Sequence, residues 1–371
     1  MSEQNEASFF EEPVDFGRPI ITRGRLFSFP LHSLIRKSAI GPGNCPSIVW
    51  DGQNSAFYGL VIGRESRQEP HLFMFDSNST VEDIGAIEGL EATAGFLLFD
   101  GSERLLCCLI DPKGGSHLFV HSLAQERRMY SHMWGHFLFG PIDPLDTVIK
   151  DDRAIAGAAN PLDSRVYLVT AAGILHRVEL DNGKVERLGA VPPQNLSAVL
   201  ACDPSTGNLY GVSGRGRLWR WDGSEVTVFD ARVPTMKNRD YAASCSSLVW
   251  HDGKIYGSTL QDAYLFEFAP AEGVVKNLGR PDENSEIRGI EVLPDGRVFG
   301  ITATPGRGMG HLFCYSRKTG FSDLGVIHGW QPINDFAYEP LCIRAGASGD
   351  FLIGNGEGRS NVFLYCSAPE S

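Results

Sequence analysis

The stretch EVLPDGRVFGITATPGRGMGHLFCYSRKTGFSDLG, from Glu291 to Gly325, decides the fold of this chain. In it, EVL and RVFG flank a Pro-Asp-Gly step, and such a step supplies the positive-φ positions that a tight hairpin turn requires. HLFCY then alternates with period two, which predicts a third strand. A further segment ends in the step Leu324-Gly325. The stretch therefore predicts four short strands joined by tight turns.

The third strand of this unit recurs seven times. Its copies are HLFMF at His71, HLFVH at His117, ILHRV at Ile174, RLWRW at Arg217, YLFEF at Tyr264, HLFCY at His311 and NVFLY at Asn361. Successive starts differ by 46, 57, 43, 47, 47 and 50 residues, which is near the period of a four-stranded propeller blade. The repeat predicts an all-β, seven-bladed β-propeller.

The last copy, at Asn361, is followed by too few residues to form the outer strand of its blade. The segment ITRGRLFSFP, from Ile21 to Pro30, has the pattern of a spare strand, so we expect it to close the ring on the last blade. The prediction is one propeller domain over 1–371. Its parts are an N-terminal extension at 1–18, the closing strand at 19–30, and blades at about 45–87, 93–140, 153–191, 195–233, 245–280, 287–327 and 339–368.

The longest interval between copies, from His117 to Ile174, holds extra residues. We place the outer strand of the second blade at His136 to Gly140, with an insertion before it.

Composition excludes several classes of protein. A formal net charge of −12 argues against nucleic-acid binding, which needs a basic footprint. No run of 18 apolar residues and no basic-then-apolar leader occurs, so we expect no membrane partner and a cytoplasmic location, with export as the alternative if the given sequence is trimmed. The eight cysteines show no zinc-site spacing and are predicted to be buried reduced thiols. We predict no cofactor, with a structural metal ion in the channel left as an open alternative.

The connections between blades point to one face of the ring. If strands A to D run from the axis outward, the D–A and B–C connections share one face, and the A–B and C–D turns share the other. The D–A connections are the longer ones, namely 231–245, 280–289 and 327–340. Loops on a rigid scaffold usually carry function, so we expect the site on the D–A face, around the channel mouth.

Residues of this face suit the binding of an anionic sugar. The expected catalytic residues are His328, Tyr241, Tyr338 and Arg288, and the expected substrate-binding residues are Arg153, Arg239, Trp330, Asn334, Lys237 and Asn195. Arginine presents a planar fork to a carboxylate, tryptophan offers an apolar face to a sugar ring, and His or Tyr can remove a proton. In the alternative interpretation, Arg153 and Arg288 pair with Asp151, Asp152, Glu286 or Glu291, and the aromatic residues pack the loop.

Three histidines occupy the same repeat position, at His71, His117 and His311. Because they lie in different blades, they are too far apart to share one metal ion, and we predict no metal site. We expect each to bond a neighbouring loop, for example through a loop carbonyl.

The repeats with DGRVFG, HLFCY and DLG steps resemble seven-bladed propellers generally, and the architecture resembles polysaccharide lyases such as oligogalacturonate, ulvan and rhamnose-glucuronate lyases. That resemblance implies a carbohydrate-active enzyme that cleaves a uronate-containing oligo- or polysaccharide by β-elimination. Two alternatives stay open: a non-catalytic propeller that binds a protein or glycan on the D–A face, and a cyclase or isomerase that uses the same channel mouth.

Overall fold

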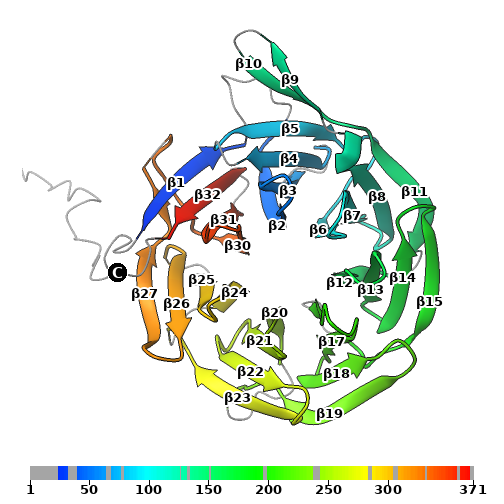
Figure 1. Ribbon diagram of the computed structural model, residues 1–371, viewed down its shortest axis with the longest axis vertical. Coiled ribbons are helices and arrows are strands. Elements are labelled where there is room, and N and C mark those ends of the chain that lie inside the picture. Colours follow the sequence, from blue (N-terminus) through cyan, green and yellow to red (C-terminus); the bar gives the residue numbers. More distant parts are fainter. Residues whose placement is uncertain are drawn as a thin grey trace, which may run out of the picture.

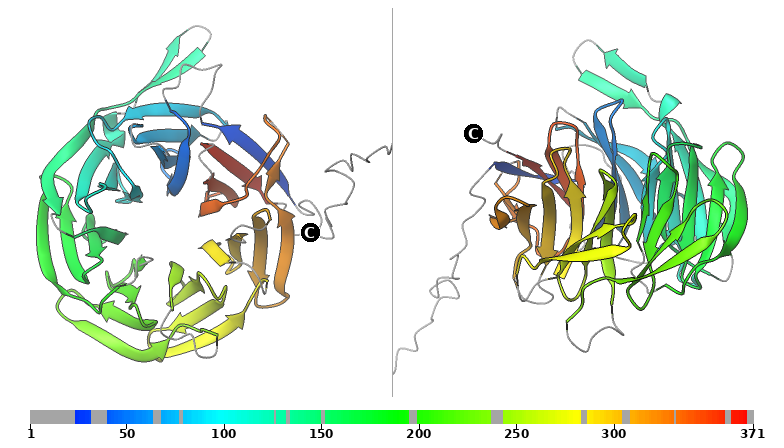
Figure 2. Two further views of the ribbon diagram at one scale, coloured as in Figure 1. Left: turned by 180° about the vertical axis from the view of Figure 1, so that it is seen from behind. Right: turned by 60° about the horizontal axis from the view of Figure 1, so that its bottom comes forward.

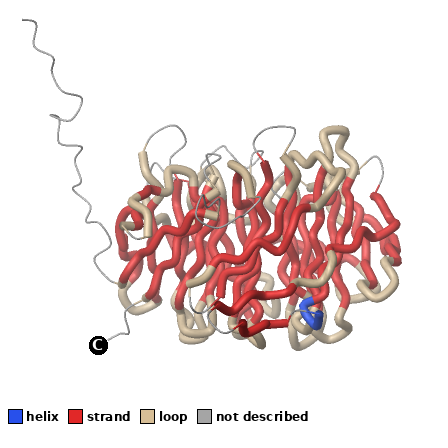
Figure 3. The backbone as a smooth tube through the Cα atoms, turned by 90° about the horizontal axis from the view of Figure 1, so that it is seen from above, coloured by secondary structure: helices blue, strands red, loops and turns tan. Residues whose placement is uncertain are grey.

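The structure is a computed structural model that describes residues 24–31, 40–63, 68–76, 79–125, 127–131, 134–149, 152–194, 199–236, 243–282, 286–303, 308–330, 332–356 and 360–367. In this part of the chain, seven four-stranded antiparallel sheets stand in a ring, each with its first strand nearest the axis (Figure 1). The strands run between two faces built of loops (Figure 3). The predicted seven-bladed propeller is confirmed.

Each blade is a sheet whose strands A to D follow one another outward. Blade 1 has β2 (Gly43–Asp51), β3 (Ala56–Gly63), β4 (His71–Asp76) and β5 (Val81–Ala86). Blade 2 has β6 (Ala94–Phe99), β7 (Arg104–Ile110), β8 (Ser116–Ser122) and β11 (Ile142–Ile149). Blade 3 has β12 (Ala154–Asn160), β13 (Arg165–Thr170), β14 (Ile174–Glu179) and β15 (Lys184–Ala190). Blade 4 has β16 (Leu200–Cys202), β17 (Leu209–Val212), β18 (Arg217–Trp221) and β19 (Val226–Arg232).

The remaining blades complete the ring. Blade 5 has β20 (Cys245–His251), β21 (Lys254–Thr259), β22 (Leu265–Ala269) and β23 (Val274–Gly279). Blade 6 has β24 (Glu286–Val292), β25 (Val298–Ala303), β26 (His311–Ser316) and β27 (Gly320–Val326). Blade 7 has β30 (Pro340–Ala345), β31 (Asp350–Asn355), β32 (Asn361–Cys366) and, as its outer strand, β1 (Arg25–Pro30). The seven copies of the repeat are the C strands.

Blade 2 differs from the prediction. Its outer strand is β11, whereas the segment predicted for it, His136 to Gly140, belongs largely to β10 (Trp134–Leu138), which pairs with β9 (Arg127–Ser131) in a separate hairpin. This hairpin projects from the rim of the ring, next to the short 3-10 helix η1 (Leu123–Gln125) (Figures 1 and 2). The prediction was wrong because two nearby segments have strand character, and only pairing with β8 identifies the blade strand.

The ring is closed by the N-terminal strand, as predicted. β1 pairs antiparallel with β32, from Arg25 opposite Cys366 to Pro30 opposite Asn361. Nearer the axis, Arg344 of blade 7 forms an ion pair of 2.9 Å with Glu291 of blade 6, and its Nε donates to the Ile48 carbonyl of blade 1 at 3.2 Å. Three consecutive blades are therefore tied together where the two chain ends meet.

The repeat carries a glycine–aromatic pair that sets the contact between strands B and C. Cross-strand partners are Gly59 and Phe73, Gly211 and Trp219, Gly257 and Phe266, and Gly300 and Phe313. A Cβ atom added to any of the four glycines would lie 2.1–2.3 Å from a ring atom of its partner. The ring lies over the glycine Cα, so the Tyr-Gly and Phe-Gly steps of the sequence are packing requirements.

The Asp-Leu-Gly step forms a bulge in strand D. In blade 6, the backbone N–H of Gly325 donates to Asp323 Oδ1 at 2.9 Å, and Gly325 has a φ of +114°, which glycine adopts readily. The same aspartate contacts His311 Nδ1 at 3.3 Å, and His71 contacts Asp83 in the same way at 3.2 Å. The predicted repeat role of these histidines is thus a bond to a carboxylate on strand D, in place of the loop carbonyl offered as an example.

The core fills the space between neighbouring blades. Among the largest fully buried side chains are Trp219, Tyr58 and Tyr365.

All eight cysteines are free thiols, and Cys45, Cys107, Cys108, Cys202, Cys245, Cys314, Cys342 and Cys366 are buried or partly buried. Burial raises the pKa of the Cys108 thiol to about 12. None of the described helices has the length and apolar character that a membrane span requires.

Candidate functional site

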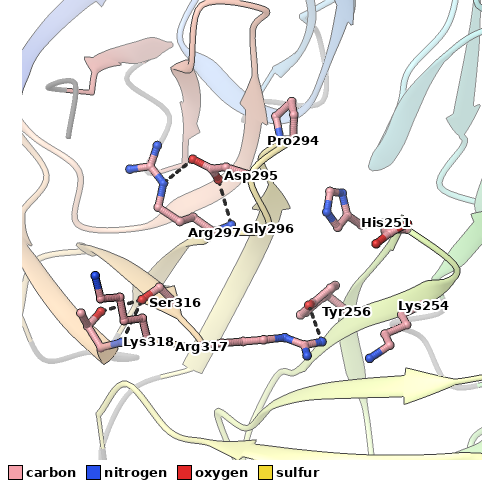
Figure 4. A pocket seen from close by; sticks show the side chains of 12 residues that line it. His251, Lys254, Tyr256, Pro294, Asp295, Gly296, Arg297, Ser316, Arg317 and Lys318 are labelled. Carbon is pink, nitrogen blue, oxygen red and sulfur yellow. Dashed lines mark hydrogen bonds and ion pairs between the residues drawn. The ribbon is translucent and has the colours of Figure 1, made fainter.

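A cavity of about 620 Å³ opens between blades 5 and 6, on the face that carries the A–B and C–D turns. Three short turns build it: the A–B turns of blades 5 and 6 and the C–D turn of blade 6. We call it the basic groove and define it by His251, Asp252, Lys254, Tyr256, Pro294, Asp295, Gly296, Arg297, Ser316, Arg317, Lys318 and Thr319 (Figure 4). It lies within the size range of ligand sites.

Arg317 joins the two walls of the groove. Its guanidinium reaches from blade 6 to blade 5, where it donates to the Tyr256 hydroxyl at 3.2 Å (Figure 4). It also donates to the carboxylate of Glu267. Lys254 Nζ donates to the other oxygen of Glu267 at 2.8 Å. Glu267 is only 6% exposed, so one buried carboxylate holds two cations at the floor of the groove.

The ionised carboxylate of Glu267 and the cations bound to it stabilise one another at the floor of the groove. Burial alone would raise the pKa of Glu267, but the hydrogen bond from Lys254 and the charge of Arg317 bring it below its ordinary value. The hydrogen bond to Tyr256, together with the charge of Glu267, raises the pKa of Arg317. Arg317 therefore stays charged at neutral pH, and its side chain is still 57% exposed to solvent.

The rim supplies further positive charge. Arg297 Nε donates to Asp295 Oδ2 at 2.7 Å, which orders that turn (Figure 4). Lys318 is exposed, and its side chain makes no hydrogen bond or ion pair with the described residues. The lining and the floor together have four cationic side chains against the carboxylates of Asp252, Asp295 and Glu267, in a protein whose net charge is −12. The groove is a local basic site on an acidic molecule.

Four of the predicted residues on the D–A face come together in a second place. His328, Trp330, Asn334 and Tyr338 belong to a hairpin of β28 (His328–Gly329) and β29 (Asp335–Phe336). The hairpin packs against the closing strand: the Ser28 hydroxyl donates to the Ile333 carbonyl, and a Cβ on Gly329 would strike Ser28. It is therefore placed at the outer strand of blade 7.

His328 in this hairpin is enclosed. It is 4% exposed, its ring stacks on Phe336 at 3.8 Å, and Nε2 lies 2.6 Å from Asn334 Oδ1. Trp330, with a ring centroid 4.5 Å from that of His328, is 59% exposed, and Tyr338 is 36% exposed. His328 thus supports an aromatic surface in this arrangement, and its Nε2 is already engaged by Asn334.

The predicted arginines lie apart from this hairpin. Arg288, in β24 beside the axis, forms an ion pair of 2.8 Å with Glu286, as the alternative interpretation expects. Arg153 is exposed just before β12. The other predicted residues, Lys237, Arg239, Tyr241 and Asn195, lie outside the described residues. The sugar site drawn from these positions stays a prediction.

Among the described residues, no group of three or more His, Cys, Asp or Glu side chains is arranged to hold a metal ion. His117, the third of the repeated histidines, bonds Asp111 through Nε2 at 2.9 Å, and that hydrogen bond lowers the pKa of Asp111.

A smaller cavity of about 210 Å³ lies between blades 3 and 4 and is lined mainly by apolar residues such as Leu175, Leu188 and Trp221.

The sequence prediction missed the basic groove. That prediction chose the D–A face because its loops are long, whereas the groove is built from short A–B and C–D turns on the other face. One signal was present: HDGK at His251, PDGR at Pro294 and SRKTG at Ser316 each place a basic residue in or beside a turn. Equivalent turns of adjacent blades are neighbours in a propeller, so these cations could have been grouped.

Comparison with known proteins supports the fold alone. No protein-family model matches the sequence, and no curated protein matches it. The extracellular domain assigned to a one-component system, BT4673 of B. thetaiotaomicron, matches with a TM-score of 0.59 and 13% identity over 95% of this chain. This chain spans only 40% of that protein's chain. YCF48 bound to D1 peptide matches with a TM-score of 0.59 and 12% identity, over 95% of this chain and 99% of that one. By fold, the protein is a seven-bladed β-propeller.

Proposed function

We propose that the protein is a non-catalytic binding propeller whose basic groove holds an acidic peptide segment. The observation that carries the proposal is the concentration of Lys254, Arg297, Arg317 and Lys318 around one cavity of about 620 Å³ in a protein of strongly negative net charge. Opposite charge attracts such a ligand from solution and orients it as it arrives.

A peptide fits the groove better than a sugar does. Sugar rings favour an exposed aromatic face, but the groove's only large aromatic side chain, Tyr256, is 4% exposed and offers mainly its hydroxyl. Fixed guanidinium and ammonium groups match the carboxylates of Glu and Asp. YCF48, whose fold is similar, is bound to a peptide in its structure, so this architecture is compatible with a peptide ligand.

The lyase interpretation has weaker support. A β-eliminating enzyme needs a base within hydrogen-bond distance of the substrate proton and a cation near its carboxylate. In the described residues, His328 is enclosed by its own hairpin and Arg288 is paired with Glu286. Absorbance near 235 nm on incubation with uronate-containing glycans should therefore stay flat; a rise that His328→Ala abolishes would overturn the non-catalytic proposal.

The direct test is fluorescence anisotropy with a fluorescein-labelled decaglutamate peptide at low ionic strength. Lys318→Glu should weaken binding about tenfold, since it replaces one attraction by a repulsion at an exposed site, and Asp252→Asn should strengthen it. Lys113→Glu is the matched control, because Lys113 is exposed in the B–C turn of blade 2, on the other face. Equal weakening by Lys318→Glu and Lys113→Glu would show a non-specific charge effect and would refute the proposal that the peptide binds in the basic groove.

A further inference from the structure

We infer that, in the absence of a partner, the basic groove binds the acidic N-terminal segment of its own chain, residues 3–15, which an external ligand must displace. This inference rests on the proposed function, because it assigns an occupant to the same site.

Charge is the first argument. The segment EQNEASFFEEPVD has carboxylates at Glu3, Glu6, Glu11, Glu12 and Asp15 and no Lys or Arg. The groove has an excess of positive charge, with four cationic side chains against three carboxylates when Glu267 of the floor is counted. Outside the segment and the groove lining, the chain has 38 Asp and Glu against 29 Lys and Arg. The acidic segment is therefore attracted by this cavity, whereas the rest of the chain has a net negative charge.

The apolar part of the segment also has counterparts. Phe9 and Phe10 lie between its acidic residues. The groove offers the Pro294 ring, the His251 imidazole and the aliphatic parts of its long cationic side chains. Arginine and lysine stems cover apolar groups while their charged ends stay in water. The lining of the basic groove can thus bind both the acidic and the aromatic residues of the N-terminal segment.

The point at which the segment joins the ring is the second argument. Because β1 pairs antiparallel with β32, Arg25 lies opposite Cys366, at the C-terminal end of a C strand. The C strand of blade 6 ends in the same direction, at Ser316, which lines the groove. Arg25, the first residue of β1, therefore lies at the face that carries the groove, in the blade next to blade 6.

The chain is long enough to reach. Residues 3–15 precede Arg25 by 10 to 22 positions, which span up to about 33 to 73 Å when extended. A compact chain of this length has a radius of gyration of about 21 Å. The groove is thus within the reach of the acidic segment without any change in the propeller.

Occupancy within one chain has a measurable consequence. A tethered segment has an effective concentration of about 1 mM. If its intrinsic dissociation constant is about 100 μM, it weakens the apparent affinity for an external acidic peptide by about tenfold. Removing the charges of the segment should remove this competition.

The experiment uses the full chain. The test variant is Glu3→Gln, Glu6→Gln, Glu11→Gln, Glu12→Gln and Asp15→Asn combined, and binding of the fluorescein-labelled decaglutamate is compared with that of the unaltered protein. The control variant removes the same charge from exposed positions outside the groove, by Glu88→Gln, Glu91→Gln, Glu103→Gln, Glu225→Gln and Asp230→Asn. We expect about tenfold tighter binding by the test variant and a much smaller change in the control.

The outcomes separate the two proposals. If the test and control variants bind alike while Lys318→Glu still weakens binding about tenfold, the groove is a binding site but its occupancy by the N-terminal segment is refuted. If Lys318→Glu has no effect in either background, the proposed function itself fails. Zero-length carbodiimide coupling should link Lys318 to a Glu of the segment within one chain; linkage between two copies would overturn the intramolecular form.

Discussion

The glycine–aromatic pair of the repeat makes a quantitative prediction at Gly257. A Cβ added there would lie 2.2 Å from Cζ of Phe266 and 2.7 Å from both Cε atoms. Carbon atoms in contact prefer about 3.5–4.0 Å, so the ring must retreat by more than about 1 Å. Phe266 is 0% exposed and packs in a cluster with Leu248 and Ile255, which leaves little space for that movement. Gly257→Ala should therefore lower the free energy of unfolding by about 2 kcal/mol, as overpacking of a core does.

Urea denaturation followed by tryptophan fluorescence measures this effect. The midpoint should fall by about 0.5 M for a chain of this size. Gly189→Ala is the control, because a Cβ at Gly189 meets nothing within 4 Å, and its midpoint should stay unchanged. Phe266→Leu should relieve the clash, so Gly257→Ala should cost at least 1 kcal/mol less in that background. If Gly257→Ala and Gly189→Ala unfold at the same urea concentration, the packing role assigned to the repeat glycine is wrong.

Two further predictions concern the closing strand and the floor of the groove. Phe29 of β1 packs edge-on against Phe75, with ring centroids 4.9 Å apart, so Phe29→Ala should destabilise the whole ring by about 2 kcal/mol; an unchanged melting temperature in calorimetry would show that closure contributes little. The pKa of Glu267 is lowered in the fold, so its contribution to stability is present above its unfolded value of about 4.3 and is lost as pH falls through the folded pKa. The difference in unfolding free energy between the unaltered protein and Glu267→Gln should shrink from pH 6 to pH 3.5, and an equal difference at both pH values would contradict this.

Local sequence was sufficient for the architecture. Strand C is visible as alternating apolar residues in every repeat, and four of the seven turns between strands A and B have Asp-Gly steps whose backbone requirement is local. The closing strand could be predicted too, because a blade without an outer strand at one end of the chain must obtain it from the other end. These inferences depend on short-range patterns and on counting strands, which need no knowledge of side-chain packing.

The pairing of strands in blade 2 and the side-chain contacts between neighbouring blades could be determined only from the tertiary structure. Two segments after η1 have strand character, and only pairing with β8 makes β11 the blade strand. Arg317 and Glu267 are 50 residues apart in the sequence. Arg317 nevertheless donates a hydrogen bond to Glu267, because the C–D turn of blade 6 lies beside the strands of blade 5. His328, expected beside the channel with Arg288, lies instead against the closing strand. The sequence determines which strands form, since their patterns are local, whereas a site between blades depends on the lengths and directions of side chains that only the packed ring brings together.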